Sequence, residues 1–393
     1  MPDSARESIS KRIDAILGSL HAKSQFRTLE NPPGINLYSN DYLGLAQDPR
    51  LKQAVLQAVE KTESMGATGS RLLSGNSPAW EEVERQFASF AGTEAALYFG
   101  SGYAANIGLI SSLAARGDFI FSDALNHASL IDGIRLSGAT KIIYPHGDMN
   151  FLEQALRERS SQPGAKLIVT ESVFSMEGDV APIDKIVSLA DEYGASVIVD
   201  EAHATGVYGP EGRGFAAAAG MEGRILASVH TCGKALASAG AFVCCAQKTR
   251  DFLINRARTF IFSTAMPPYM AKQIGAALAL ARASGDRREH LVKISELLRR
   301  NLSAAGIDLG GSRTHIIPVR AGGNEAALRV AEELQRCGFA VRAIRPPTVP
   351  PESSRVRLSL TALLSVEDVQ GLACATEAAC KALVGILTNY LHA

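Results

Sequence analysis

Three groups of residues in this chain could carry out chemistry together. Lys234 stands among small residues after an apolar stretch (residues 225–227), with no carboxylate beside it in the sequence. Asp200 ends another apolar stretch, with His203 three residues later, and a glycine turn occupies residues 100–102. These are the parts that a pyridoxal phosphate site needs. The turn binds phosphate, the acid pairs with the pyridinium nitrogen, and the lysine carries the aldehyde.

Each of these residues also has a structural interpretation. Lys234 alone could be a solvated loop charge, and Asp200 alone could cap a turn. A carboxylate at the end of an apolar strand is costly to bury unless it pairs with a cation, and a protonated ring nitrogen is such a partner. His203 could reach the ring oxygen, and His127, in the turn after another strand, could stack on the ring. The combination favours a cofactor site.

The glycine turn leaves a second hypothesis open. Residues 100–105 (GSGYAA) resemble the dinucleotide fingerprint, with Asp123 about where a ribose-binding acid would stand. A nicotinamide-dependent dehydrogenase is therefore an alternative, which quenching of NADH fluorescence would test. That fingerprint usually opens its domain, whereas here a whole region precedes it, and it leaves Lys234 unexplained. Lys234 does not belong to a Walker A loop, because Ser228 and Ala235 replace its first glycine and its magnesium-binding residue.

Composition excludes several other classes of protein. The 40 basic and 40 acidic residues cancel, which argues against a nucleic-acid binder. The N-terminus lacks an apolar signal core, and no apolar run reaches the roughly 18 residues of a membrane span. The six cysteines show no paired spacing, so we expect no metal site and mostly buried thiols in a reducing, cytoplasmic setting.

The order of apolar patterns predicts an α/β protein with two domains in its 393 residues. An amphipathic helix is expected at residues 8–24, and helices should begin at Asp48-Pro49 and Ser77-Pro78. Most of the predicted strands are apolar on both faces, as buried parallel strands are. They cover residues 95–99, 118–122, 141–144, 166–170, 196–199, 225–229 and 241–245. We expect an N-terminal arm (1–45), a large domain (46–285) and a smaller α+β domain (286–393).

Motifs spread over nearly the whole chain resemble those of the α-oxoamine synthases, a family of fold-type I pyridoxal phosphate enzymes. The resemblance implies a large, mostly parallel sheet domain followed by a smaller α+β C-terminal domain. Two features depart from the family: the segment between Arg27 and Asn40 is short, and Cys232 stands where an aromatic residue is common. The motifs are SNDYLGL (39–45), GSRLLSG (69–75), NHASL (126–130), TESVFSMEGD (170–179), VDEAH (199–203), TCGK (231–234), STAMPP (263–268), AIRPPTVP (343–350) and RVRLSLT (355–361).

The resemblance also implies a role for individual residues. Four are catalytic: Lys234 binds the cofactor covalently, Asp200 pairs with its pyridinium, His203 with its ring oxygen, and His127 stacks on the ring and contacts substrate. The remaining cofactor contacts would be Gly102, Tyr103, Ser175 and Thr231, with Ser263 and Thr264 reaching the phosphate held by the partner subunit. The substrate contacts would be Asn40 and Arg357 for the amino-acid carboxylate, and Arg27, Arg345 and Thr348 for the acyl substrate.

Family members join an amino acid to an acyl thioester and release CO2. Residues 343–350 have the form associated with members that use L-alanine and a pimeloyl thioester to make 8-amino-7-oxononanoate in biotin biosynthesis. Condensation of glycine with acetyl-CoA is the alternative within the family. A cofactor-free partner subunit is a third hypothesis, although such subunits lack the lysine. The resemblance implies a homodimer with shared active sites, and the sequence leaves open whether coenzyme A or an acyl carrier protein delivers the acyl group.

Overall fold

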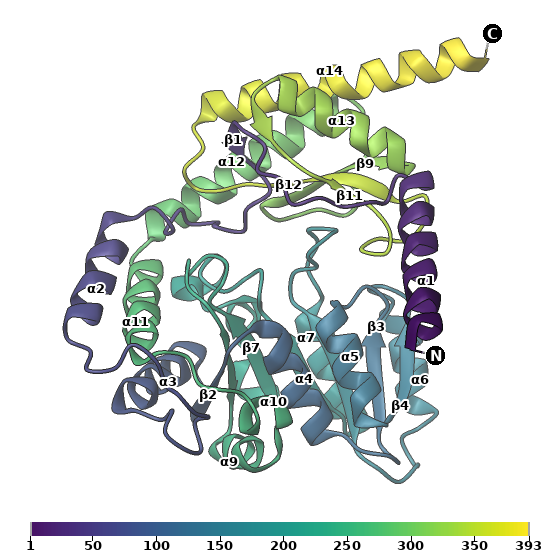
Figure 1. Ribbon diagram of the computed structural model, residues 1–393. Coiled ribbons are helices and arrows are strands. Elements are labelled where there is room, and N and C mark those ends of the chain that lie inside the picture. The colour runs from purple at the N-terminus through teal and green to yellow at the C-terminus, as the bar shows by residue number, and fades with distance from the viewer. Residues whose placement is uncertain (1, 392–393) are drawn as a thin grey trace.

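A seven-stranded sheet forms the centre of the protein in the computed structural model, which describes residues 2–391 (Figure 1). The strand order is β2-β8-β7-β6-β5-β3-β4. Neighbouring strands are parallel except where β8 pairs antiparallel with β2 and β7. The mostly parallel sheet and its strands are therefore as predicted: β2 Ala95–Phe99, β3 Phe119–Asp123, β4 Thr140–Tyr144, β5 Lys166–Glu171, β6 Ser196–Asp200, β7 Ala227–Thr231 and β8 Ala241–Cys245.

Apolar side chains on both faces of the strands explain why helices cover both sides of this sheet. Ile168 and Val169, adjacent on β5, are both fully buried but pack into opposite layers, as alternation along a strand requires. One layer contains α4 (Gly102–Leu113), α5 (Ala128–Ser137), α9 (Gln247–Arg256) and α10 (Arg258–Ile261), and the other contains α6 (Met149–Arg157) and α7 (Ile183–Tyr193).

A smaller antiparallel sheet, with strand order β11-β12-β9, lies above the large one in Figure 1. A separate parallel pair joins β1 to β10, and so ties the segment near residue 35 to the C-terminal third of the chain. The predicted boundary near residue 285 coincides with the start of α12; the division into domains stays a prediction. The elements are β1 Ile35–Asn36, α12 Gly285–Ala304, β9 Ile316–Gly322, α13 Asn324–Arg336, β10 Phe339–Ala340, β11 Ala343–Ile344, β12 Ser354–Ser359 and α14 Val366–Leu391.

The predicted helix boundaries near residues 48 and 78 are confirmed. Asp48 caps α2 (Pro49–Glu60) by accepting a hydrogen bond from the backbone N–H of Arg50. Gly92 closes α3 (Pro78–Ala91) at φ 70°, a left-handed conformation that glycine adopts without strain. The short α8 (Phe215–Ala218) follows β6, and α11 (Pro268–Arg282) packs against α2 and α3.

Gly178 forms a close contact between the two sheets. Its carbonyl accepts hydrogen bonds from the backbone N–H groups of Arg313 and Thr314 and from the Thr314 hydroxyl. Its φ is +68°, and a β-carbon there would lie 1.9 Å from the carbonyl oxygen of Ile316. The loop after β5 therefore touches the chain just before β9 without room for a side chain.

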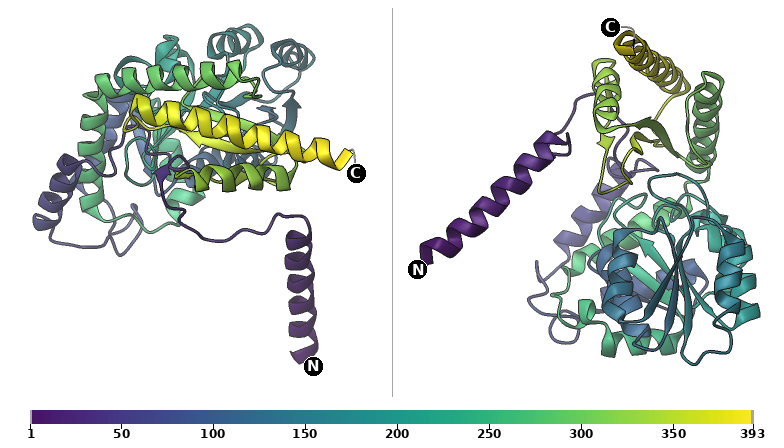
Figure 2. Two further views of the ribbon diagram at one scale, coloured as in Figure 1. Left: turned by 90° about the horizontal axis from the view of Figure 1, so that it is seen from above. Right: turned by 90° about the vertical axis from the view of Figure 1, so that its right-hand side faces the viewer.

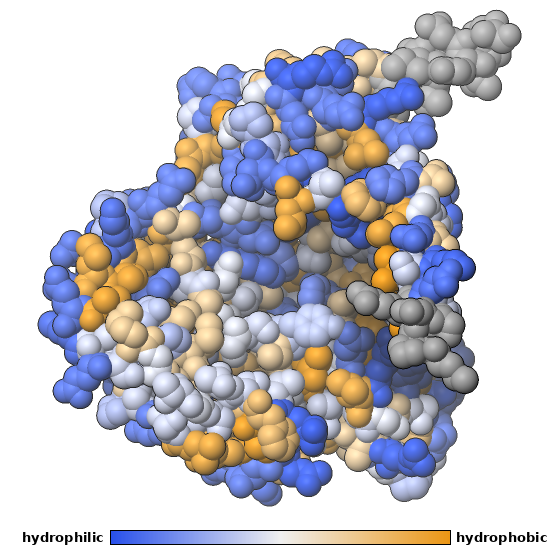
Figure 3. Space-filling model, in the orientation of Figure 1, coloured by the Kyte–Doolittle hydropathy of each residue, from blue (hydrophilic) through white to orange (hydrophobic). Residues whose placement is uncertain are grey.

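Helix α1 (Pro2–Ala22) confirms the predicted N-terminal helix, but its apolar side faces solvent in the single chain. Ile9, Ile13 and Ile16 are 54%, 50% and 54% exposed. Figure 2 shows the helix projecting away from the rest of the protein, and apolar residues follow the edge of Figure 3 where α1 lies.

The cysteines follow the prediction only in part. Cys232, Cys244 and Cys245 are buried, whereas Cys337, just after α13, and Cys374, in α14, are exposed, so the expectation of mostly buried thiols was wrong for those two. Among the helices of residues 2–391, none has both the length and the apolarity needed to cross a bilayer.

Candidate active site

The carboxyl ends of the central strands bring the predicted acid and lysine together. Asp200 ends β6, Glu171 lies beside it at the end of β5, and Thr231 ends β7. Parallel strands present their carboxyl ends at one edge of a sheet, where ligands bind in this class of fold. A cavity of about 910 Å³ opens there, and Lys234, His203, His127, Asn40 and Arg357 are among the residues that line it.

Lys234 lies in the turn after β7, half-buried, with its Nζ 2.7 Å from His203 Nε2. Burial lowers the pKa of Lys234 to about 8; Asp200 and Glu171 oppose that shift, and Arg357 adds to it. A lysine with a lowered pKa carries a larger fraction of free amine near neutral pH, which suits a nucleophile or a base.

Asp200 and Glu171 form a pair of buried carboxyl groups at the ends of two neighbouring strands. The Asp200 oxygens accept from uncharged donors, Asn106 Nδ2 at 2.7 Å and the Ala202 N–H at 2.8 Å. Burial, and then the charge of Asp200, raise the pKa of Glu171 well above its usual range. Glu171 therefore favours its protonated form beside Asp200.

His127 borders the cavity, and Tyr103 lies beside His127. His127 precedes α5, and its Nδ1 lies 2.7 Å from the Ser129 hydroxyl. Desolvation lowers the pKa of His127, opposed by Asp200 and assisted by Lys234. Tyr103 is 42% exposed, contacts His127 edge-on at 6.3 Å between ring centroids, and hydrogen-bonds Asp132. A neutral, accessible imidazole can stack on a flat ring.

The glycine turn lies at the N-terminus of α4. Ser101 caps the helix by accepting from the Ala104 N–H at 3.0 Å. A β-carbon built on Gly102 would come no closer than 3.9 Å to Thr231, so the turn faces open space beside β7. Free N–H groups and the positive end of the helix dipole make this turn suitable for a phosphate.

Together these groups fit pyridoxal phosphate. The Asp200 carboxylate is held only by uncharged donors and lies beside a Glu171 Oε1 that has no hydrogen-bond partner in the described residues. A cationic ring nitrogen would satisfy that charge. Asp200 would hold the ring nitrogen, His203 the ring oxygen, His127 one ring face, the Gly102 turn the phosphate, and Lys234 the aldehyde carbon.

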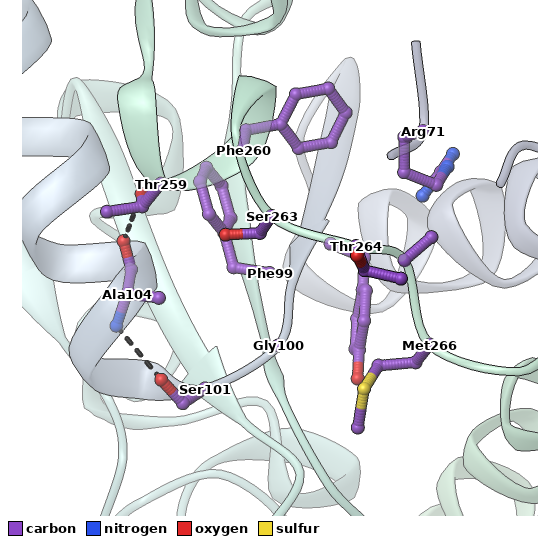
Figure 4. Close-up of a pocket in the computed structure, with 12 residues that line it drawn as sticks. Arg71, Phe99, Gly100, Ser101, Ala104, Thr259, Phe260, Ser263, Thr264 and Met266 are labelled. Carbon is purple, nitrogen blue, oxygen red and sulfur yellow. Dashed lines mark hydrogen bonds between the residues drawn. The ribbon is translucent and has the colours of Figure 1, made fainter. Parts of the chain in front are cut away.

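Ser263 and Thr264 lie elsewhere. They line a second cavity, of about 260 Å³, together with Gly100, Ser101 and Arg71 on the other side of the turn (Figure 4). Lys234 does not border this cavity. A single chain therefore does not bring these two residues to its own lysine, and their predicted role toward a partner subunit stays a prediction.

Asn40 and Arg357 meet at the cavity wall. Both terminal nitrogens of Arg357 donate to Asn40 Oδ1, at 3.2 and 3.1 Å, and its Nε donates to the Ser175 carbonyl at 2.6 Å. The Arg357 guanidinium has no carboxylate partner in the described residues, although the residue is 7% exposed. A buried cation without an anion is a suitable site for a substrate carboxylate.

Arg27, Arg345 and Thr348 lie together but make different contacts. Arg345 donates to the backbone carbonyls of Ser24 and Phe26, so its guanidinium holds the N-terminal arm. Arg27 donates to the carbonyls of Arg345 and Pro346 and to the Thr348 hydroxyl. Thr348 borders the main cavity, whereas Arg27 and Arg345 border a neighbouring one of about 810 Å³.

Three residues at the site were not predicted. Tyr42 hydrogen-bonds His203, Asn40 and Arg357; Asn106 holds Asp200; Glu171 lies beside Asp200. Glu171 carried a usable signal, because like Asp200 it ends an apolar run. Tyr42 lies inside the SNDYLGL motif, but no role was assigned to it there.

Comparisons with known proteins agree with this geometry. The family model "Aminotransferase class I and II" matches residues 32–375. A Bacillus cereus (strain G9842) protein with the provisional name 8-amino-7-oxononanoate synthase is 45% identical, over 90% of this chain and 93% of its own length. A similarly named Geobacillus kaustophilus protein is 46% identical over 87% of each.

Solved structures give the same picture. A serine palmitoyltransferase from S. paucimobilis superposes with a TM-score of 0.87, at 31% identity over 96% of this chain and 98% of that one. An 8-amino-7-oxononanoate synthase from Francisella tularensis superposes with a TM-score of 0.76, at 28% identity over 88% of this chain and 98% of that one.

Proposed function

The chain belongs to the aminotransferase class I and II family and, within it, to the pyridoxal phosphate-dependent acyltransferases known as α-oxoamine synthases, and from that premise we propose that it condenses L-alanine with a pimeloyl thioester. The products are 8-amino-7-oxononanoate, CO2 and the free thiol. The observation that carries the proposal is the buried Arg357 guanidinium, which faces the cavity beside Lys234 and lacks a carboxylate partner in the described chain. The names of the curated relatives support the choice of substrates.

The amino-acid half of the reaction uses residues of the cavity wall. Bound pyridoxal phosphate supplies the electron sink for loss of the α-proton. Arg357 and Asn40 hold the carboxylate and fix which bond at the α-carbon faces Lys234. The Lys234 amine removes the proton, because its lowered pKa leaves part of it unprotonated. Asp200 keeps the ring nitrogen protonated through its own negative charge.

The acyl half uses the apolar part of the same cavity. Leu125, Ile131, Met176 and Val349 line it, and the proline-rich turn closes one side. These side chains suit an acyl chain, whose burial is favourable by about 0.8 kcal/mol per CH2. Thr348, oriented by Arg27, would position the thioester at the rim.

A substrate matrix tests the proposal. Alanine, glycine and serine are each combined with pimeloyl-, acetyl- and palmitoyl-CoA and with a pimeloyl carrier protein, and thiol release and product mass are measured. We expect alanine with a pimeloyl thioester to react fastest. Faster reaction of glycine with acetyl-CoA would favour the predicted alternative. Faster reaction of serine with palmitoyl-CoA would favour the activity named for the similar transferase structures.

We propose further that two chains share their active sites in a homodimer. In the single chain Ser263 and Thr264 are exposed and do not border the Lys234 cavity, which supports a role toward another chain. Inactive Lys234→Ala protein, mixed with inactive Thr264→Ala protein, should regain activity after subunit exchange. Verified exchange without recovery would contradict shared sites.

A further inference from the structure

An unbroken line of hydrogen bonds joins the substrate carboxylate site to the lysine. Arg357 donates to Asn40 Oδ1, and the Tyr42 hydroxyl donates to the same oxygen at 2.9 Å. The Tyr42 oxygen lies 2.5 Å from His203 Nδ1, and His203 Nε2 lies 2.7 Å from Lys234 Nζ. Tyr42 is thus the only described side chain that contacts both Asn40 and His203 in this line.

The Tyr42 hydroxyl has one proton and two neighbouring acceptors. When it donates to Asn40 Oδ1, the contact with His203 requires Nδ1–H to be the donor, and Nε2 presents a lone pair to Lys234. When it donates to His203 Nδ1 instead, the imidazole proton must sit on Nε2. The direction of one hydroxyl therefore decides whether Nε2 is an acceptor or a donor.

The surroundings of His203 and Tyr42 keep each side chain in its neutral form. Burial lowers the pKa of His203 well below its usual range, with Lys234, Arg357, His315 and His127 lowering it further, so the ring carries a single proton. Burial also raises the pKa of Tyr42, which Arg357 and Ser359 only partly oppose, so the hydroxyl keeps its proton. Tyr42 is 0% exposed and its ring packs edge-on against His315, 3.9 Å between centroids. The ring is fixed, and only the hydroxyl hydrogen can turn.

We propose that Tyr42 is a positioning residue that couples the Asn40–Arg357 carboxylate site to the protonated nitrogen of His203. An incoming carboxylate takes donors from Arg357 and Asn40, the amide of Asn40 turns toward it, and Tyr42 loses its acceptor there. The hydroxyl then donates to His203 Nδ1. Nδ1 releases one proton to water and Nε2 takes one from water, so the total charge is unchanged. This inference rests on the proposed role of Asn40 and Arg357.

The change of tautomer affects the group that lies beside His203 Nε2. Before the amino acid binds, the lone pair on Nε2 favours a positive charge at Lys234. Afterwards, Nε2–H favours a negatively charged neighbour, and the ring oxygen of the cofactor, which His203 would hold, is such a group. Binding of the carboxylate would thus stabilise the negative charge on the ring oxygen before any bond to the α-carbon breaks.

The coupling can be tested without turnover by adding propionate, a carboxylate that has no amine, to the holoenzyme. The readout is the pH midpoint of the cofactor's visible absorption band with and without saturating propionate. The charge of propionate raises the midpoint in every variant, whereas the new Nε2–H bond lowers it only where both Asn40 and Tyr42 are present. We expect the wild-type shift to lie roughly 0.7 unit or more below that of Tyr42→Phe, which corresponds to a five-fold coupling.

Tyr208→Phe is the matched control. It also removes a buried hydroxyl beside an imidazole, since Tyr208 lies 3.0 Å from His315 Nδ1, but it does not contact His203. Its shift should equal that of wild type. Asn40→Ala leaves Tyr42 only the His203 acceptor, so its midpoint without propionate should already be low and its shift should match that of Tyr42→Phe. This second variant decides the question if Tyr42→Phe fails to fold.

Equal shifts in wild type and Tyr42→Phe, or in wild type and Asn40→Ala, would overturn the coupling. No acyl thioester enters the measurement, so its failure is distinguishable from failure of the proposed reaction. An enzyme that makes 8-amino-7-oxononanoate but shows equal shifts keeps its function and loses only this role for Tyr42.

Discussion

The two walls of the active-site cavity are built in different ways. The cofactor wall consists of side chains at the ends of β5, β6 and β7, buried and fixed by neighbouring strands. The acyl wall consists of residues 346–351, which border this cavity, backed by residues 24–30 and 342–345 beside the neighbouring cavity. Nearly all are exposed or half-buried, and they are joined largely through arginine contacts to backbone carbonyls. A strand end holds a side chain in place wherever the sheet forms. A turn held by arginines forms only when two segments about 320 residues apart in the sequence come into contact.

This difference predicts that substitutions in the cofactor wall abolish chemistry, whereas substitutions in the acyl wall alter only affinity. Five variants, ordered from the largest expected effect to the smallest, test that contrast.

Lys234→Ala should have the largest effect, because it removes both the covalent attachment and the base. We expect turnover to fall by at least ~10³-fold. Borohydride reduction of wild-type holoenzyme should place the pyridoxyl group on Lys234, as peptide mass spectrometry would show. Lys166, the other lysine in a largely enclosed site, is the internal control and should stay unlabelled. A label on another lysine would show that Lys234 is not the residue that binds the cofactor covalently.

Asp200→Asn should follow. Removing one partner of a buried charge pair costs about 3–5 kcal/mol, and each 1.36 kcal/mol is tenfold in rate, so we expect turnover to fall by ~10² to 10⁴-fold. The cofactor should still load, because the phosphate turn and Lys234 are intact, and absorbance would measure that. Near-normal turnover at full loading would show that the acid is not needed.

Arg357→Ala tests the residue that stands between the two walls. Loss of a charge-assisted hydrogen bond should weaken alanine binding by about 1.5–3 kcal/mol. The measurement is a spectral titration of holoenzyme with alanine. Unchanged alanine affinity would show that the carboxylate of alanine binds at another site.

His146→Gln tests a contact outside the cavity that joins the end of β3 to the loop after β5. His146 Nδ1 and Nε2 lie 2.9 and 2.7 Å from Asp123 and Asp179. Burial opposes protonation, but these two acids outweigh it and raise the pKa of His146 to about 10. Because the folded-state pKa is raised, the stabilisation is complete below the unfolded value near 6.5 and is lost as pH rises through about 10.

Denaturant unfolding at pH 6 and pH 11 measures this effect. We expect the variant to be about 1.5–3 kcal/mol less stable at pH 6, with the difference much smaller at pH 11. A difference that grows with pH would contradict the ion-pair account.

Arg345→Ala should have the smallest effect. Its hydrogen bonds go to the carbonyls of Ser24 and Phe26, and a typical hydrogen bond contributes about 0.5–1.5 kcal/mol. We expect the KM for the thioester to rise severalfold while the alanine titration stays unchanged. A large loss of turnover would show that the two walls are not independent.

The same contrast explains what could be predicted from the sequence. Apolar runs ending in Asp200, and small residues around Lys234, indicated the cofactor wall, because the order of strands and helices determines where strand ends meet. The antiparallel direction of β8 had no signal in its apolar pattern. The exposed side of α1 could not be predicted either, since an amphipathic pattern says which side is apolar but not what covers it.

Partners far apart in the sequence limited the rest. The contacts of Tyr42 with His203 and Arg357 span 161 and 315 residues, and only the folded chain brings them together. Arg345 was predicted to face the acyl substrate. Its contacts with the arm suggest that it supports the rim instead, and the Arg345→Ala variant distinguishes these roles.

Gly178, at the contact between the two sheets, has a consequence for the gene. Every missense change of a glycine codon introduces a β-carbon, and at this position that atom would collide with the Ile316 carbonyl at 1.9 Å. At Gly18, in α1, nothing lies within 4 Å, so the same kind of codon change meets open space. A saturation library of the gene should therefore lose all nineteen replacements at codon 178 under selection for biotin synthesis, while codon 18 tolerates many of them.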